Sequence, residues 1–363
     1  MGPRVVVAMS GGVDSSVAAA LLSEQGYDVI GIAMRLAADT PSSSARRRGT
    51  CCSHEDFEDA RRVAERLRFP FYVVDLRSAF SAGVVADFVG EYLAGRTPNP
   101  CVVCNREIKF SRLWERAAAL NADFVATGHY ARIEADACGR FRLLRAVDYA
   151  KDQSYFLFNL TQEQLRRTLF PLGSMTKDAV RVRARALGLA TADKPESQEI
   201  CFVPDGDYAS FVERSAAPQA LRPGNIVDDD GLRLARHEGV HRFTVGQRRG
   251  LGVAAAEPLY VRKIDPFSGD VVVSGRARLT SAGLLASRVN LIPPMRSDAG
   301  FAAQVKIRYR HPALPASVKM TGSDCAEVRF ENGGPAVTPG QACVFYDSDE
   351  VLGGGIIERA IEL

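Results

Sequence analysis

Apolar runs alternate with amphipathic segments over the first 130 residues of the chain. Short β-branched runs at residues 4–9, 29–34 and 71–75 predict buried strands, and the longer periodic segments between them predict helices. A further strand is predicted at residues 123–127. Strands that alternate with helices form a parallel, doubly wound sheet, and its ligands bind at the carboxyl ends of the strands.

After about residue 205 the pattern changes to short strands separated by Gly, Pro and Asp turns, which is typical of β-rich modules and barrels. We therefore predict an α/β protein with a catalytic domain over residues 1–205, a small central β-rich domain over 206–280 and a C-terminal β-barrel over 281–363. No run reaches the ~18 apolar residues that a membrane span needs. The start of the chain has no targeting pattern, so we expect a cytoplasmic protein with no membrane partner.

Charge is nearly balanced, with 46 Lys and Arg against 43 Asp and Glu, so net charge alone does not indicate a nucleic-acid partner. Its distribution is uneven, because residues 281–320 are strongly basic. Lys306, Arg308 and Arg310 alternate there, so in a strand they would share one face. Such a face is either a phosphate-binding stripe or the solvated side of an edge strand, and the pattern leaves both readings open.

The most informative segment is AMSGGVDSS at residues 8–16, between a predicted strand and a predicted helix. Its two glycines let the backbone approach an anion closely, and successive N–H groups, hydroxyls and the helix N-terminus then bind phosphate oxygens. The simpler alternative is a capped turn without a ligand. The segment matches SGGxDS, the PP-loop of ATP pyrophosphatases, which split ATP into AMP and pyrophosphate and transfer AMP to a carbonyl-type oxygen.

The eight cysteines are too sparse for a disulfide scaffold, so catalytic, metal-binding or core roles are expected. Cys101 and Cys104 form a CxxC pair that follows a Pro-Asn-Pro turn and opens a helix. A helix N-terminus and the neighbouring Arg106 both lower a thiol pKa and favour a nucleophilic thiolate. Cys201 lies in a second segment, ESQEICFV. The remaining cysteines are expected to be buried, capping or bystander residues: Cys51, Cys52, Cys138, Cys325 and Cys343.

Taken together, the motifs resemble the tRNA-specific 2-thiouridylase family, whose members replace the 2-oxygen of the wobble uridine, position 34, by sulfur. The resemblance rests on SGGVDSS, TPNPCVVCNREIKF, TGHYAR, KDQSYFLF, ESQEICFV, FTVGQRRGL and KIRYR, and it runs from residue 8 to about residue 345. It implies ATP-dependent adenylation of the uracil C2 oxygen, followed by sulfur transfer from a cysteine persulfide. The implied products are 2-thiouridine, AMP and pyrophosphate.

The resemblance also implies individual roles. Cys104 is expected to be the nucleophile and Cys201 the persulfide carrier, and the two are expected to form a disulfide once sulfur has been delivered. The ATP-binding residues, with Mg²⁺ held through the phosphates, are expected to be Ala8, Met9, Ser10, Gly11, Gly12, Val13, Asp14, Ser15, Met34 and Gly128. The tRNA-binding residues are expected to be Asn99, Pro100, Cys101, His129, Lys151, Asp152, Gln153, Arg308, Tyr309 and Gln341. A cysteine desulfurase or a sulfur-relay protein is the expected sulfur donor.

One position departs from the family pattern. Residue 101 is often Asp in the family, a plausible acid or base beside the uracil, whereas this chain has Cys. Three thiolates, those of Cys101, Cys104 and Cys201, leave an iron–sulfur cluster open as an alternative sulfur carrier. A PP-loop enzyme that amidates a small molecule is a second alternative, although the chain shows no glutaminase pattern. A non-catalytic RNA-binding protein is a third, and the intact PP-loop and cysteines argue against it.

Overall fold

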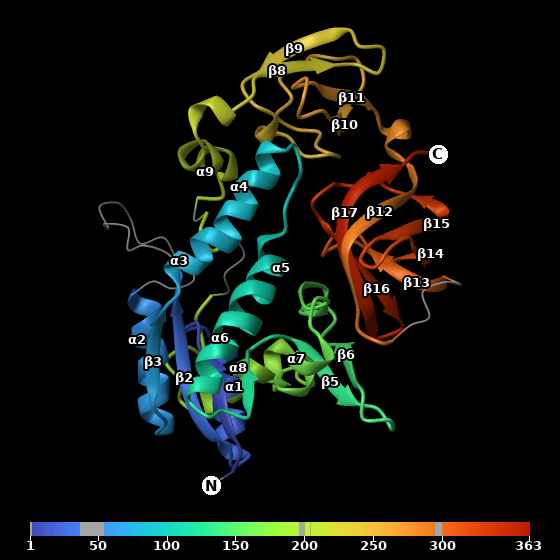
Figure 1. Ribbon diagram of the computed structural model, residues 1–363. Helices are drawn as coiled ribbons and strands as arrows, with labels where there is room; N and C mark the ends of the chain where they lie inside the picture. The colour runs from blue at the N-terminus through green and yellow to red at the C-terminus, as the bar shows by residue number, and fades with distance from the viewer. Residues whose placement is uncertain (1, 37–53, 196–199, 204, 295–299) are drawn as a thin grey trace. The chain divides into compact units, whose positions relative to one another are not determined.

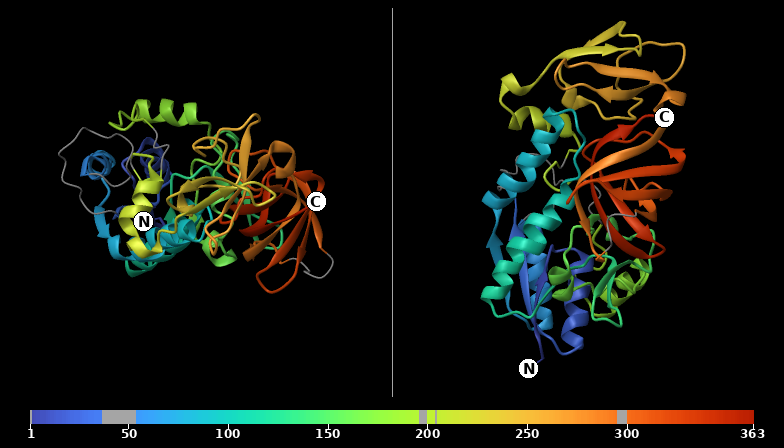
Figure 2. Two further views of the ribbon diagram at one scale, coloured as in Figure 1. Left: turned by 90° about the horizontal axis from the view of Figure 1, so that it is seen from above. Right: turned by 45° about the vertical axis from the view of Figure 1, so that its right-hand side comes forward.

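The computed structural model in Figures 1 and 2 describes residues 2–36, 54–195, 200–203, 205–294 and 300–363. Cys51 and Cys52 lie outside these ranges. The chain divides into two compact units, the first made of Met1–Val84, Cys101–Gly206 and Asp349–Val351, and the second of Val85–Pro100, Asp207–Ser348 and Leu352–Leu363. Among the described residues, no helix is both long enough and apolar enough to cross a membrane.

A five-stranded parallel sheet forms the centre of the first unit, in the order β3-β2-β1-β4-β7. Its strands are β1 (Arg4–Ala8), β2 (Asp28–Arg35), β3 (Phe71–Asp75), β4 (Phe124–Ala126) and β7 (Thr168–Leu169). This order confirms the predicted fold class. It also places the carboxyl end of β1 between those of β2 and β4. The sequence pattern of residues 161–169 predicts a single helix, but α7 (Gln162–Arg166) ends early and β7 pairs with β4 instead.

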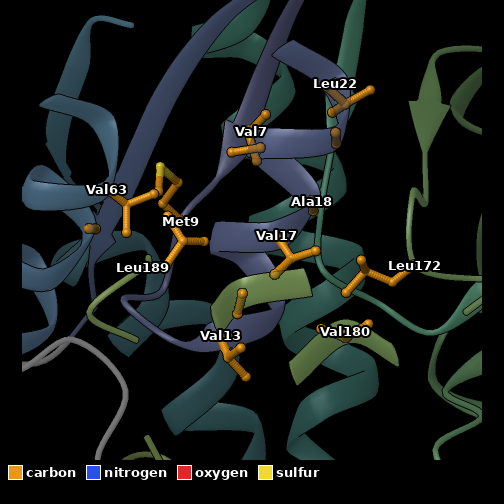
Figure 3. Close-up of a cluster of buried hydrophobic side chains, with 14 of the residues drawn as sticks. Val7, Met9, Val13, Val17, Ala18, Leu22, Val63, Leu172, Val180 and Leu189 are labelled. Carbon is orange, nitrogen blue, oxygen red and sulfur yellow. The ribbon is translucent and has the colours of Figure 1, made fainter. Parts of the chain in front are cut away.

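Helices α1 (Val13–Glu24), α2 (His54–Leu67) and α8 (Lys177–Ala186) pack on one face of this sheet. Figure 3 shows the apolar cluster between them. In this cluster Val7 of β1 and Met9, just after β1, pack with residues of the three helices: Val17 of α1, Val63 of α2 and Val180 of α8. Alternate strand residues point to opposite faces, so Val6 and Ala8 face away from this cluster. Helix α6 (Leu113–Ala119) contacts β1 and β4. Because β1 is buried on both faces, the side chains on both of its faces are apolar.

Two stretches switch between α- and π-helix. The first is α3 (Arg77–Phe80), η1 (Ser81–Val85) and α4 (Ala86–Leu93), and the second is α5 (Pro100–Cys104), η2 (Asn105–Arg112) and α6. The sequence pattern predicts a helix over residues 107–120, but the helical stretch starts earlier, at Pro100, and includes the CxxC pair. A π-helical turn widens the helix and often marks a functional site.

The first unit also contains shorter elements, among them the hairpin β5 (Ala131–Ala135) and β6 (Phe141–Arg145), and the 3₁₀ turn η3 (Ser154–Phe156). Cys138 is exposed in the turn of this hairpin.

The second unit contains a four-stranded sheet and a closed barrel, which confirms both predicted β-rich parts. The sheet has the order β10-β11-β8-β9, from β8 (Gly224–Val227), β9 (Arg233–His237), β10 (Leu259–Ile264) and β11 (Val271–Gly275). The six barrel strands are β12 (Ser281–Leu291), β13 (Phe301–Lys306), β14 (Leu314–Met320), β15 (Ala326–Gly334), β16 (Ala342–Asp347) and β17 (Glu350–Ile361), and pairing of β12 with β17 closes the barrel. Shorter elements are α9 (Tyr208–Ser215), η4 (Pro218–Ala220), η5 (Val240–Arg242) and η6 (Arg276–Leu279).

The predicted basic face of Lys306, Arg308 and Arg310 is wrong. Strand β13 ends at Lys306, and the chain turns over the next residues, so the alternation does not place the three side chains on one face of a strand. A strand period describes side-chain direction only while the backbone remains extended.

Candidate active site

The loop between β1 and α1 has the geometry of an anion cradle. Gly11 has φ +70°, and a Cβ at this position would lie 2.2 Å from the carbonyl oxygen of Asp56, so the position requires glycine. Ser15 Oγ donates to the Gly12 carbonyl at 3.2 Å and accepts from the Ser10 N–H at 3.2 Å. Gly12, at the N-terminal cap of α1, makes no side-chain capping bond. The first N–H groups of α1 therefore remain available for an anion.

Asp14, in the first turn of α1, is held by two side chains that sequence reasoning did not select. Lys177 Nζ, on the buried side chain that opens α8, lies 2.8 Å from each Asp14 carboxylate oxygen. The Tyr130 hydroxyl donates to Asp14 Oδ1 at 2.8 Å. These three contacts hold the carboxylate in a defined position at the start of α1. Mg²⁺ fits this site as a companion of the nucleotide phosphates.

Lys194 joins the loop to α2. Its Nζ donates to the Gly11 carbonyl at 3.1 Å, to Asp56 Oδ1 at 2.7 Å and to Asp59 Oδ2 at 2.7 Å. Burial opposes the charge of Lys194, but the hydrogen bonds to the two carboxylates outweigh it and raise its pKa above the ordinary value.

Two further predicted nucleotide residues follow neighbouring strands. Met34 is buried near the end of β2, and Gly128 follows β4. A Cβ at Gly128 would lie 2.8 Å from both the Asp14 carbonyl carbon and the Ser15 nitrogen. Only a glycine allows the β4 end to approach the start of α1 this closely, so Gly128 and the PP-loop form one site.

Cys104 is buried at the end of α5, immediately before the π-helical segment, whereas Cys101 in the first turn of α5 is exposed. Asn105, which follows Cys104, is also buried, and its Nδ2 donates to the Phe156 carbonyl at 3.0 Å. This bond ties the cysteine helix to the segment that contains the motif KDQSYFLF. Asn105 therefore has a positioning role that its polar character alone did not reveal.

Cys201 is half-buried in a turn that Val203 closes by donating its N–H to the Ile200 carbonyl at 2.8 Å. The neighbouring Phe202 ring packs edge-on against Phe80, with 5.6 Å between ring centroids. Cys104 and Cys201 both belong to the first unit, and the structure has no disulfide between them.

The other described cysteines differ from this pair. Cys343 is fully buried in β16, and burial raises its thiol pKa to about 12, so it remains protonated and inert. Cys325 precedes β15, where the Asp324 carboxylate raises its pKa through a hydrogen bond. Across the described residues, no three His, Cys, Asp or Glu side chains converge as a metal site. Cys101, Cys104 and Cys201 are all described, so their arrangement does not fit the iron–sulfur alternative.

His129 lies just beyond Gly128 and is buried. Its Nδ1 is 2.6 Å from Thr127 Oγ1, and its Nε2 is 3.5 Å from Lys109 Nζ. Burial, with the Lys109 charge as a second cause, lowers the pKa of His129 well below its usual value. The ring is therefore neutral near pH 7 and acts as a hydrogen-bonding group rather than a cation.

In the run Lys151, Asp152 and Gln153, predicted to bind tRNA, Asp152 and Gln153 make hydrogen bonds within the protein. Asp152 is buried and accepts from the Ala146 N–H at 3.1 Å. The Tyr130 N–H donates to Gln153 Oε1 at 3.0 Å, and the Gln153 N–H donates to the Tyr130 carbonyl at 2.8 Å. These bonds fix the loop that supports Tyr130, which in turn contacts Asp14.

In the second unit, Gln341 supports the turn that precedes the cysteine helix. Its Nε2 donates to the carbonyls of Thr97 at 2.9 Å and Pro98 at 3.2 Å, directly before Asn99. Arg308 donates to Thr338 Oγ1 at 2.8 Å, while the Lys306 ammonium lies 5.7 Å from the centroid of the neighbouring Tyr309 ring.

Comparison with known proteins agrees with this architecture. Residues 3–205 match the family described as tRNA methyl transferase HUP domain, residues 209–275 its PRC-barrel domain and residues 281–357 the aminomethyltransferase beta-barrel domain. The tRNA-specific 2-thiouridylase MnmA of Geotalea uraniireducens is 56% identical over 99% of this chain and 96% of its own length. The protein of the same name from Geobacter metallireducens is 52% identical over 99% and 97%. A solved 4-thiouridine synthetase–RNA complex with bound ATP has a TM-score of 0.37 and 17% identity over 59% of this chain and 50% of that one, too low to bear on function.

The sheet, the glycine-bearing loop at its carboxyl edge and the two β-rich modules define a PP-loop nucleotide-binding protein with appended barrels. With more than half of its residues identical to full-length relatives, the chain belongs to the tRNA-specific 2-thiouridylase family of sulfurtransferases.

Proposed function

We propose that this chain 2-thiolates the wobble uridine, position 34, of tRNA in an ATP-dependent reaction that yields 2-thiouridine, AMP and pyrophosphate. The observation that carries the proposal is an anion cradle at Gly11 in the same compact unit as the buried thiol of Cys104 and the half-buried thiol of Cys201. Membership of the 2-thiouridylase family supports the choice of substrate.

Activation comes first, because the uracil C2 oxygen is a poor leaving group. The C2 oxygen attacks the α-phosphate of ATP, pyrophosphate departs, and the base then carries an O-linked AMP. Backbone and hydroxyl groups of residues 8–15 bind the phosphates at the positive end of the α1 dipole, while Met34 and Gly128 contact the adenosine. Mg²⁺ bound to the phosphates neutralises charge that develops on them.

Sulfur transfer follows by one of two routes. In the first, the terminal sulfur of a Cys201 persulfide attacks C2, AMP leaves with the oxygen, and Cys104 attacks the Cys201 sulfur to release 2-thiouridine. In the second, Cys104 attacks the persulfide first and liberates hydrosulfide, which displaces AMP from C2. Both routes end with a Cys104–Cys201 disulfide, which an external thiol must reduce. The persulfide sulfur comes from a cysteine desulfurase or a sulfur-relay protein, and the need for reduced thiols favours the cytoplasm.

tRNA recognition is proposed to involve residues from several segments of the chain. In this proposal the target base lies against Asn99, Pro100 and Cys101, and the remaining contacts come from His129, Lys151, Asp152, Gln153, Arg308, Tyr309 and Gln341. The bonds from Gln341 to Thr97 and Pro98 support this proposal, because they hold the segment next to Asn99 in a defined conformation. The target base must leave the anticodon stack to reach the cysteines. Residues 281–363 would help to hold the tRNA.

The test is thiolation of unmodified tRNA, followed by retardation in a mercury-containing gel. Wild type, Cys201→Ala and Cys104→Ala are compared with and without ATP, and a cysteine desulfurase supplies sulfur. We expect a retarded band only for wild type with ATP. Cys138→Ala is the matched control, because this exposed cysteine lies in the β5–β6 turn.

Each other outcome changes a defined part of the proposal. A band that survives Cys201→Ala would remove the persulfide role of this residue and leave free hydrosulfide as donor. No band with folded, ATP-binding wild type would favour the small-molecule PP-loop enzyme. Cys101→Asp tests the position at which the chain departs from its family: equal activity of both forms would show that no acid or base is needed there.

A further inference from the structure

A loop of the second unit, residues 244–252, presents two arginines that the proposed mechanism does not use. Arg248 and Arg249 are exposed, and within the part of the chain that the structure describes their guanidinium groups make no hydrogen bond or ion pair. Many other arginines of the protein are paired, for example Arg96 with Glu91 and Glu358. We call residues 244–252 the arginine loop.

The backbone of the arginine loop is rigidly supported. Val245 and Leu251, on either side of the arginines, are buried in the core of the four-stranded sheet. Gln247 bonds to the loop itself, accepting from the Thr244 N–H at 2.9 Å and donating to the Arg249 carbonyl at 2.9 Å. The loop therefore holds two exposed cations on a preformed backbone, which lowers the entropy lost when they bind a partner.

Hydrogen bonds connect the arginine loop to residues already proposed to meet tRNA. Arg308 donates to the Ala336 carbonyl at 3.0 Å and reaches the Val245 carbonyl at 3.4 Å. Thr244 Oγ1 lies 3.1 Å from Thr97 Oγ1, and Thr97 is the residue whose carbonyl Gln341 binds. All of these residues belong to the second unit.

We infer that Arg248 and Arg249 bind backbone phosphates of the tRNA substrate, an inference that rests on the proposed function. Guanidinium groups bind phosphate oxygens in a bidentate manner. Two adjacent arginines without acidic neighbours in the sequence suit a polyanion. Such contacts carry no sequence information, so they position the tRNA while other residues select the base. Flanking glycines at 246, 250 and 252, with φ of +90°, +75° and +67°, keep the loop tight beneath the two side chains.

The experiment measures tRNA binding by the full chain over a salt series. For Arg248→Gln/Arg249→Gln we expect an about tenfold higher Kd for unmodified tRNA, from the loss of charge-assisted hydrogen bonds. The slope of log Kd against log salt concentration should fall by about 1.4, because each of the two phosphate contacts contributes ~0.7 on single-stranded nucleic acid. Arg248→Lys/Arg249→Lys should restore the slope, since it keeps the charge. Affinity for ATP should stay at the wild-type value.

Arg233→Gln/Arg236→Gln is the matched control, because it removes the same charge from exposed positions of β9 in the same module. An equal loss of tRNA affinity in this variant would overturn the inference, because the effect would then come from net charge and not from the position of the two arginines. Unchanged tRNA binding in the arginine-loop variant, with wild type active, would overturn it while leaving the proposed function intact. Unchanged tRNA binding with slower sulfur loading from a desulfurase would instead assign the loop to a protein donor. If wild type neither binds nor thiolates tRNA, the proposed function itself fails.

Discussion

The PP-loop and the arginine loop both contain glycine at positive φ, but the cations of the two loops differ in pairing. In the PP-loop this glycine is Gly11, and in the arginine loop it is Gly246, Gly250 and Gly252. Hydrogen bonds fix the turn in both loops. Around the PP-loop, however, Lys177 and Lys194 are bound to carboxylates, whereas the arginine loop leaves its cations exposed. Pairing fixes the geometry that a reaction at phosphorus requires, because the groups need no reorganisation when the substrate arrives. Exposed cations suit a contact that must form and dissociate with each tRNA.

Removing the cation next to Asp14 should have the largest effect. Lys177→Met keeps the packed alkyl stem but leaves the Asp14 carboxylate without its ion-pair partner, so the free energy of unfolding should fall by about 3 kcal/mol. Urea denaturation measures this change. Asp14→Asn/Lys177→Met should recover much of the loss, since it removes both charges. A decrease below about 1 kcal/mol for Lys177→Met would mean that the pair behaves like an exposed salt bridge.

Adding a methyl group at Gly11 tests whether the PP-loop must be rigid. Ala at this position would meet the Asp56 carbonyl at 2.2 Å, so the loop must shift, and a displacement of about 1 Å is enough to lower kcat by about 100-fold. Gly26→Ala is the control, because Gly26 also has a positive φ, +84°, but no atom lies within 4 Å of its Cβ position. Wild-type kcat in Gly11→Ala would contradict the requirement for glycine at this position.

His129 gives a pH-dependent effect of intermediate size. Its pKa in the folded protein lies well below the ordinary value of 6.5, so on acidification the unfolded chain binds a proton that the folded chain does not. Stability should therefore be lost as the pH falls below ~6.5, at up to ~1.4 kcal/mol per pH unit. His129→Gln should flatten the curve of unfolding free energy against pH over this interval. An identical slope in both proteins would contradict a neutral, buried ring.

The smallest effect is expected in the arginine loop. Ala at Gly246 would have φ +90° and a Cβ 3.2 Å from Arg308 Nη2, the end of a flexible side chain that can move. We expect a loss of about 1 kcal/mol in unfolding free energy, from backbone strain alone. Affinity for tRNA should fall severalfold less than in Arg248→Gln/Arg249→Gln. If Gly246→Ala instead lowered turnover as strongly as Gly11→Ala, the two loops would not differ in their tolerance.

Part of the site was predictable because its signals are local. The PP-loop glycines, the CxxC pair at a helix start and the carboxyl-edge placement of Gly128 all follow from residue type and strand order. Lys177, Lys194 and Asn105 were not predicted, because a lone Lys or Asn in a polar segment has no distinctive pattern. Only their partners, more than 50 residues away in sequence, give them a function.

The sequence by itself determined the class of fold, the change of pattern after about residue 205 and the PP-loop motif at residues 8–16, since these depend on periodicity and short motifs. Tertiary structure decided the rest. It ended the basic alternation at Lys306, added β7 to the sheet after Arg166, and brought Lys177 and Lys194 to the PP-loop. It also left Arg248 and Arg249 exposed on a supported turn. Burial and pairing of side chains depend on contacts between segments that are distant in sequence, and no local pattern encodes those contacts.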